Sequence, residues 1–346
     1  MEVRLFGRSG LRVSEICLGT MTFGKAWGFG ASVEESRAIF EAYCEAGGNF
    51  IDTANNYTAG ESEQIVGELI ARDRDRFVVS TKYSLSTNLD DPNAGGNHRK
   101  NMVRALEGSL RRLGTSHVDL YWVHAWDALT PVDEVMRALD DLVRSGKVLH
   151  VGVSDTPAWV ISRAHLLAEL RGWSPFTGIQ LEYSLIERTG ERELLPMASA
   201  LGMGVVAWAP LGAGILTGKY VRNGDEVSVE DSLRGEQNSE QITVHSIEIA
   251  EDVTAVAREL DCGPAEVALA WIRQRQPGVI PAVGARTVGQ FRESLGALRL
   301  ELPSAAMDRL DAISRVELGF PHEFLERPQI RRAVFGNRGV PLGGYR

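Results

Sequence analysis

Four side chains that can hold or move a proton lie close together in the first third of the chain. Asp52 and Tyr57 follow one short apolar run, Lys82 lies near the end of the next, and His124 lies in the third. A carbonyl that accepts hydride develops negative charge on its oxygen and needs a proton donor. Tyr57 could donate this proton if the ammonium group of Lys82 lowered the pKa of its phenol. Asp52 could then hold Lys82 in place, and His124 could orient or polarise the carbonyl oxygen.

Each of these residues also has an ordinary structural explanation. A buried Asp–Lys pair often serves only stability, and a single Tyr or His beside a strand is more often a packing residue. Four such residues at successive strand ends, however, favour the catalytic interpretation.

Short β-type runs alternate with helical segments along the chain. Helices are predicted at 99–113, 131–146 and 247–260, where apolar residues recur with the helical period. The second begins at Pro131 and ends at Gly146, which are typical start and stop signals. Several strand runs are apolar on both faces, as buried parallel strands are. The eight runs predicted to be strands are 16–20, 49–54, 77–83, 117–125, 148–155, 176–184, 204–211 and 278–285.

This alternation predicts an α/β protein with a parallel sheet. A closed (β/α)₈ TIM barrel is favoured over an open sheet because eight strands fill a barrel and no G-x-G-x-x-G follows the first strand. We expect one domain over residues 1–346, with the barrel at about 12–300 and a C-terminal helix and tail at 301–346. A hairpin that turns at residues 8–10 precedes the barrel.

Three segments interrupt the alternation. Residues 84–98 and 212–242 form long polar loops after strands, and residues 316–346 form a tail that carries Pro, Gly and aromatic residues. The two loops follow strands, so they lie on the face where barrel enzymes keep their active sites. They are expected to act as lids or substrate-binding walls.

Composition restricts the partners. The net charge of −9 in 346 residues argues against a nucleic-acid partner. Three cysteines form neither a disulfide framework nor a metal site, and the seven histidines are dispersed, so no metal is expected. No apolar run reaches the length of a membrane span and no signal peptide is visible, which favours a cytoplasmic protein with no membrane partner. The sequence leaves the oligomeric state open, a homo-oligomer included.

The stretches FIDTANNY, STKY and LYWVHAWD resemble motifs of the aldo-keto reductase family, in the same order. The resemblance runs from about residue 3 to residue 315 and is nearest to bacterial members related to aryl-alcohol dehydrogenases and to potassium-channel β-subunits. It implies that Tyr57 is the general acid and that Asp52, Lys82 and His124 complete a catalytic tetrad.

The resemblance also implies a nicotinamide cofactor, NADPH/NADP⁺. Ser154 and Gln180 would bind the nicotinamide amide and Trp208 would stack on the ring, while Asp155 stands where the family usually has Asn. Arg286, at a helix N-terminus, would bind the 2′-phosphate, which favours NADPH over NADH. The cofactor-binding residues expected from the loop PLGAGILTGKY and from the segment after the last strand are Pro210, Leu211, Gly214, Leu216, Gly218, Lys219, Gly284, Arg286, Gln290, Glu293 and Ser294, the last in place of the family's Asn.

The substrate is expected to be a small carbonyl compound bound among aromatic side chains. Three functions remain open: reduction of an aldehyde or ketone, keto or enoyl reduction of a nucleotide-linked deoxysugar, and a non-catalytic regulatory subunit. A basic pocket near residues 84–98 would favour the second, and turnover of any carbonyl would argue against the third. The candidate pocket walls are Phe23, Trp27 and Trp126, with Phe29, Phe320 and Phe324 as further aromatic residues.

Overall fold

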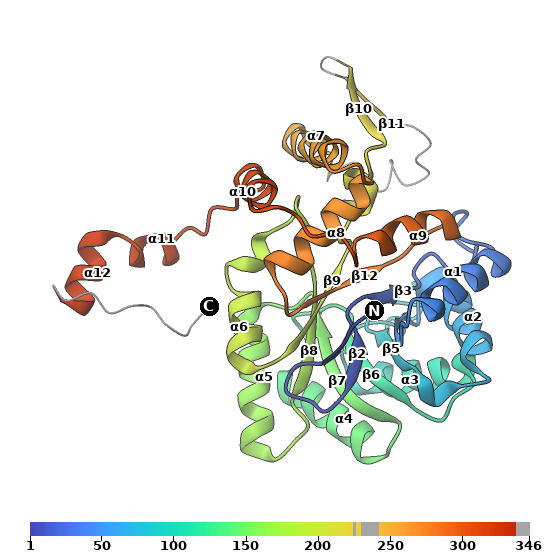
Figure 1. Cartoon of the computed structure of the whole chain (residues 1–346). Helices are drawn as coiled ribbons and strands as arrows, with labels where there is room; N and C mark the ends of the chain where they lie inside the picture. Colours follow the sequence, from blue (N-terminus) through green and yellow to red (C-terminus); the bar gives the residue numbers. More distant parts are fainter. Residues whose placement is uncertain (224–225, 230–241, 337–346) are drawn as a thin grey trace.

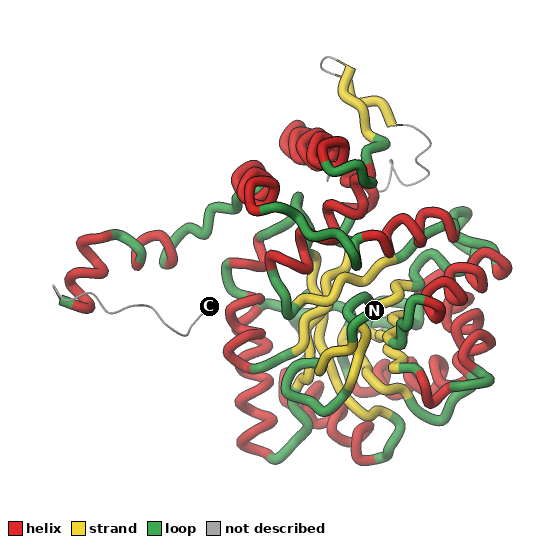
Figure 2. Tube along the Cα trace, in the orientation of Figure 1, coloured by secondary structure: helices red, strands yellow, loops and turns green. Residues whose placement is uncertain are grey.

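Eight parallel strands close into a barrel at the centre of the molecule (Figures 1 and 2). The structure is a computed structural model and describes residues 1–223, 226–229 and 242–336. Each barrel strand pairs in parallel with the next along the chain, and β12 closes the ring between β9 and β3. The barrel strands are β3 Cys17–Gly19, β4 Phe50–Asp52, β5 Val78–Tyr83, β6 Val118–Val123, β7 Val148–Ser154, β8 Phe176–Glu182, β9 Gly204–Trp208 and β12 Val279–Val283.

Helices surround the barrel and cover the outer faces of the strands (Figure 1). Both faces of β4, β5 and β6 are therefore buried, which explains why these runs are apolar without alternation. The helices are α1 Val33–Glu45, α2 Glu61–Ile70, α3 Arg99–Leu113, α4 Val132–Arg144, α5 Ala158–Arg171, α6 Leu194–Leu201, α7 Val244–Glu259, α8 Pro264–Arg275, α9 Val288–Gly296, α10 Ser304–Ile313, α11 His322–Leu325 and α12 Pro328–Phe335.

The predicted barrel is confirmed, and its elements lie where the sequence places them. All eight strands occur within the predicted runs, and α3 has the predicted bounds. His98 caps the first turn of α3, and Gly114 ends the helix with φ 63° and ψ 33°, a left-handed conformation that glycine adopts readily. The helices α4 and α7 begin and end within three residues of the predicted positions.

The predicted hairpin, β1 Val3–Leu5 and β2 Arg12–Ser14, lies next to one end of the barrel. The fully buried Phe6 follows β1, and its ring contacts Phe50 and Trp122 inside the barrel at centroid distances of 5.7 and 6.3 Å. A Cβ added to Gly178 or Gly204 would come within 2.4 to 2.6 Å of the Phe6 ring, so both positions must lack a side chain. The hairpin therefore inserts an aromatic plug into the barrel end that carries the strand N-termini.

The segment after β9 differs from the predicted loop. It contains a short 3₁₀-helix, η4 Gly212–Thr217, and an antiparallel hairpin, β10 Tyr220–Asn223 and β11 Glu226–Val229. The dipeptide Gly224-Asp225, a two-residue hairpin-loop signal between Asn223 and Glu226, could have predicted this hairpin. Residues 224–225 and 230–241 lie outside the described residues.

The 84–98 segment contains neither helix nor strand, as expected. The tail carries α11 and α12, which extend away from the barrel in Figure 1. Its residues 337–346 lie outside the described residues. In the part of the chain that the structure describes, none of the helices has both the length and the apolar character that a membrane crossing requires.

Candidate active site

The four candidate catalytic residues meet at the C-terminal end of the barrel. Asp52 is the last residue of β4, Lys82 is the last but one of β5, and His124 directly follows β6 rather than lying within it. Parallel pairing sets Asp52 beside Ser80 and therefore close to Lys82 on the neighbouring strand. Active sites of such barrels are built at this end of the strands.

Lys82 is the centre of the group. Its side chain is 0% exposed, and its Nζ atom donates to the Asp52 carboxylate, to the Thr53 carbonyl at 2.9 Å and to the Tyr57 hydroxyl at 3.1 Å. Ser80 donates a further hydrogen bond to Asp52 at 2.5 Å. The ammonium group thus has three acceptors, which fixes its position beside the phenol.

Burial and charge set the protonation states. Burial opposes the charge on Lys82, but the Asp52 carboxylate holds the pKa of Lys82 above its ordinary value, so the group remains an ammonium. Burial, together with the Lys82 charge, lowers the pKa of His124 well below its usual range, so the imidazole is neutral. The tyrosine differs from the sequence prediction: burial raises the pKa of Tyr57 above its ordinary value, and Lys82 only partly opposes this rise.

An unusual turn presents the Tyr57 side chain. Tyr57 begins the 3₁₀-helix η1 Tyr57–Gly60, in which Thr58 and Ala59 adopt φ values of 45° and 56°. Such left-handed conformations are unfavourable for residues with a side chain. The Thr58 hydroxyl stabilises the turn by donating to the Phe23 carbonyl at 2.7 Å. The His124 ring lies 5.7 Å from the Tyr57 ring, so both flank one position at the barrel mouth.

The expected nicotinamide-binding residues lie on the neighbouring strands. Ser154 and Gln180 are buried, and within the described part of the chain Ser154 Oγ and Gln180 Nε2 have no hydrogen-bond partner. Unpaired buried polar atoms are costly, so these two are suited to a polar ligand. Asp155 accepts a hydrogen bond from the Trp208 indole at 3.0 Å, and burial raises the pKa of the Asp155 carboxyl.

The loop expected to hold the pyrophosphate follows β9. In η4, Ala213 and Gly214 adopt φ values of 51° and 97°, a local backbone that can form an anion-binding concavity. Pro210, Leu211, Gly218 and Lys219 border this turn in the chain. The Leu216 side chain is buried in the core and its N–H donates to the Leu211 carbonyl at 3.2 Å, and its contact with the cofactor stays a prediction.

The segment after β12 carries the expected adenosine contacts. Gly284 and Arg286 precede α9, and the Arg286 N–H donates to the Gln290 side chain at 3.1 Å. The Arg286 guanidinium makes no ion pair with the described residues. The Glu293 side chain is exposed, whereas the buried Ser294 donates its hydroxyl to the Gln290 carbonyl at 3.0 Å.

The expected substrate walls are only partly brought together. Trp27 lies 6.4 Å from the Tyr57 ring and 6.0 Å from the ring of Phe29, and Trp126 is half-buried. Phe23 is wrongly predicted as a wall, because its side chain is 0% exposed and packs in the core. Phe324 lies on α11, which extends away from the barrel in Figure 1, and Phe320, shortly before α11, is 84% exposed.

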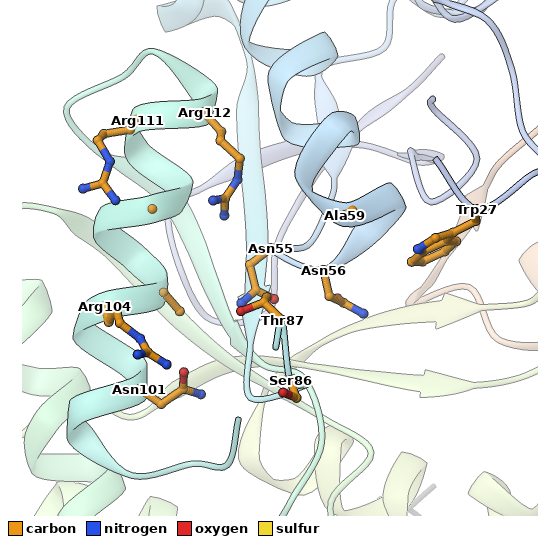
Figure 3. Close-up of a pocket in the computed structure, with 12 residues that line it drawn as sticks. Trp27, Asn55, Asn56, Ala59, Ser86, Thr87, Asn101, Arg104, Arg111 and Arg112 are labelled. Carbon is orange, nitrogen blue, oxygen red and sulfur yellow. The ribbon is translucent and has the colours of Figure 1, made fainter. Parts of the chain in front are cut away.

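A cavity of about 420 Å³ lies beside this site, and its charge was not anticipated (Figure 3). Arginines of α3 border it on one side, and the residues just before Tyr57 border it on another. The regular positions of these arginines on one predicted helix could have indicated it. The lining residues are Trp27, Asn55, Asn56, Ala59, Ser86, Thr87, Asn101, Arg104, Ala105, Gly108, Arg111 and Arg112.

Comparisons with known proteins agree with the barrel fold. The aldo/keto reductase family model matches residues 15–315, and the chain belongs to this family. It is 36% identical to norsolorinic acid reductase of Aspergillus flavus over 331 residues, which cover 93% of this chain and 83% of the relative. It is 34% identical to a putative aryl-alcohol dehydrogenase of Saccharomyces cerevisiae, with 92% and 87% covered, and 37% identical to the uncharacterized oxidoreductase YrpG of Bacillus subtilis, with 90% and 96% covered. The chain is thus an oxidoreductase of a family that acts on small carbonyl compounds with nicotinamide cofactors.

Proposed function

We propose that the protein reduces an aldehyde or ketone to the alcohol with NADPH, and that Tyr57 is the general acid. The observation that carries this proposal is the partly buried hydrogen bond of 3.1 Å between the Lys82 ammonium and the Tyr57 hydroxyl, with the Asp52 carboxylate also bound to Lys82. A purely structural ion pair would not need a phenol at the barrel mouth.

The residues divide the work of proton transfer. The Tyr57 hydroxyl donates its proton to the carbonyl oxygen, and the Lys82 ammonium stabilises the phenolate that remains. His124 is neutral, so it can orient the carbonyl oxygen by a hydrogen bond without adding charge. Asp52 keeps Lys82 charged and fixed throughout.

Bound NADPH supplies the hydride. The fit of the cofactor is supported by the unpartnered Ser154 Oγ and Gln180 Nε2 atoms beside the mouth, which suit a carboxamide. We assign the ring-stacking position to Trp208, the pyrophosphate to the η4 turn, and the 2′-phosphate to the guanidinium of Arg286, with Gln290 and Glu293 nearer the adenosine.

The substrate class follows from the walls and the relatives. Two relatives are named as acting on norsolorinic acid or on aryl alcohols, and Trp27 offers an aromatic surface next to Tyr57. We therefore propose an aromatic or ring-bearing carbonyl compound. The basic cavity beside residues 84–98 favours a second candidate, a carbonyl compound that carries phosphate or another anionic group.

The test is a cofactor titration followed by intrinsic tryptophan fluorescence. We expect NADPH to bind more tightly than NADH, and Arg286→Ala to weaken NADPH binding to the level of NADH while leaving NADH binding unchanged. Arg292→Ala, an exposed arginine of the same helix that is given no ligand contact here, is the matched control. The proposal would be contradicted if neither nucleotide bound. It would also be contradicted if the protein reduced none of the carbonyl compounds tested.

A further inference from the structure

The cavity of Figure 3 lies outside the barrel, next to the catalytic residues. It is bordered by α3, by the 55–59 segment that leads into and includes part of η1, and by the loop after β5, and Figure 3 shows the arginines of α3 on one side, Asn55 and Asn56 in the middle and Trp27 at the opposite end. The residues assigned to the cofactor do not line it. Its lining residues include three arginines and no acidic side chain.

Arg112 is held in this cavity by a buried carboxylate. Its Nε atom donates to Glu63 at 2.6 Å, and Glu63, which is 0% exposed, also accepts a hydrogen bond of 2.5 Å from Thr81. Among the described residues, the Nη1 and Nη2 atoms of Arg112 have no hydrogen-bond partner. The end of the guanidinium fork is thus fixed in place and still able to bind an anion through two N–H groups.

Two glycines make room for this arginine. A Cβ on Gly108 would lie 3.1 Å from Arg112 Nη1, and a Cβ on Gly60 would lie 2.9 Å from its Cδ atom. A side chain at Gly60 would require Arg112 to shift, and Gly60 also adopts a φ of 92° that favours glycine. A side chain at Gly108 would press on the guanidinium group, so the Arg112 side chain packs closely against both glycines.

The other charges leave an excess of positive charge. Arg104 pairs with Asp91 at 2.8 Å, and Arg112 pairs with Glu63. Arg111 is exposed and has no ion pair with any described residue. One uncompensated guanidinium and one partly free guanidinium thus face the same cavity.

Neutral polar atoms point to the rest of the ligand. Asn55 is 3% exposed, and in the described chain its Oδ1 atom has no hydrogen-bond partner. The Oδ1 atom of Asn56 is also buried and unpartnered there. Amide oxygens accept hydrogen bonds, so both Oδ1 atoms are suited to a ligand group that donates one, such as a hydroxyl.

The cavity is connected to the catalytic site through the chain and through Trp27. Asn56 directly precedes Tyr57, and the Trp27 ring, which lines the cavity, lies 6.4 Å from the Tyr57 ring. We propose that this cavity binds an anionic, hydroxyl-bearing part of the substrate, a phosphate or carboxylate group held by Arg111 and Arg112, while the carbonyl lies at Tyr57. The substrate role rests on the proposed function, whereas the anion site does not.

The anion site is tested by calorimetric titration of the full-length protein without cofactor. The probes are glycerol 1-phosphate, glycerate and, as the uncharged comparison, glycerol. We expect one of the two anions to bind, and its dissociation constant to rise at least about tenfold in Arg111→Gln and in Arg112→Lys. Arg112→Lys retains a charge beside Glu63, and Arg111 has no ion pair with any described residue, so neither variant is expected to leave a buried charge unpaired.

Two controls make this result specific. Arg163→Gln removes an exposed arginine of α5 that does not line the cavity and is expected to leave binding unchanged. Arg286→Ala reports binding at the site assigned to the cofactor phosphate. The inference would be overturned if neither anion bound. It would also be overturned if Arg286→Ala alone weakened binding, because the anion would then occupy the site assigned to the cofactor phosphate. Preference for glycerol 1-phosphate identifies a phosphate ligand, and preference for glycerate identifies a carboxylate.

The substrate role is tested with paired aldehydes, 4-carboxybenzaldehyde and 4-methylbenzaldehyde. In Arg111→Gln we expect kcat/KM for the carboxylated compound to fall at least about fivefold relative to that for the neutral one. An unchanged ratio with normal turnover overturns the substrate role and leaves the proposed function intact. Anion binding without turnover of any aldehyde contradicts the proposed function and leaves only the anion site.

Discussion

Two opposing effects act on the Tyr57 hydroxyl. Burial disfavours the phenolate and raises the pKa of Tyr57, while the Lys82 ammonium 3.1 Å away favours the phenolate. Burial is the larger effect in the protein without ligands. The ammonium therefore limits the rise and makes the proton easier to donate than it would be from a buried tyrosine alone.

Removal of the hydroxyl tests its role directly. We expect Tyr57→Phe to lower kcat for carbonyl reduction by about 10²–10⁴-fold, the usual contribution of a general acid. NADPH affinity is expected to stay within about twofold, because Tyr57 is given no role in cofactor binding. Steady-state kinetics and fluorescence titration measure the two effects. A variant that retains full activity would show that another group donates the proton.

The pH profile tests Lys82. Reduction requires the protonated phenol, so activity is lost as the pH rises through the pKa of Tyr57. Without the ammonium, the pKa of Tyr57 is higher still, so Lys82→Met must shift this alkaline decline to higher pH while lowering the maximal rate. The measurement is kcat/KM against pH for the double variant Lys82→Met/Asp52→Asn compared with the unsubstituted protein, so that neither charge of the pair remains buried without its partner. Loss of the Asp52 charge lowers the pKa of Tyr57, but this effect is smaller than the loss of the Lys82 charge. A shift of the alkaline decline to lower pH would contradict the proposed effect of Lys82 on the pKa of Tyr57.

At the scale of elements, α3 connects fold and site, because it carries the cavity arginines and ends at Gly114. A Cβ at Gly114 meets no atom within 4 Å, so replacement by Ala tests only the left-handed conformation at φ 63°. We expect Gly114→Ala to lower the free energy of unfolding by about 1–2 kcal/mol. Gly10→Ala is the matched control, since it also meets no atom and its φ is not positive. The free energy of unfolding is measured by urea titration. An equal decrease in Gly114→Ala and Gly10→Ala would show that the left-handed conformation at Gly114 is not the cause.

The sequence predicts regular elements well where the pattern is local. The eight strand runs and α3 follow from apolar periodicity and end signals, and four proton-transfer residues at strand ends indicate the site. The buried position of Phe23 could not be predicted, because whether an aromatic residue lines a pocket or packs in the core depends on residues far along the chain. The same holds for Arg112, whose place is set by Glu63 on another helix and by the space at Gly60 and Gly108.

At the scale of the whole molecule, we propose that the chain forms a single domain. One hydrophobic core includes residues from Ile16 to Leu310, with contributions from the barrel strands and the surrounding helices. A second hydrophobic cluster lies inside the barrel, and Phe6 of the N-terminal hairpin segment packs there with residues of the barrel strands, Phe50 and Trp122 among them.

The plug makes a measurable contribution to stability. Phe6→Ala removes a fully buried ring that contacts Phe50 and Trp122, so we expect the free energy of unfolding to fall by about 3–5 kcal/mol. Leu5→Ala is the control, because the neighbouring Leu5 side chain is 59% exposed and should have little effect. Denaturant titration followed by circular dichroism measures both, and equal midpoints would show that the plug does not stabilise the barrel.

The plug and the catalytic group lie at opposite ends of the same strands, and this separation matters for engineering. Substitutions that strengthen the hairpin around Phe6 are expected to improve the heat and solvent tolerance of a biocatalyst without changing which compounds it accepts. Libraries aimed at new compounds can instead be confined to the residues around Trp27 and the 84–98 segment, where a change does not reach the plug.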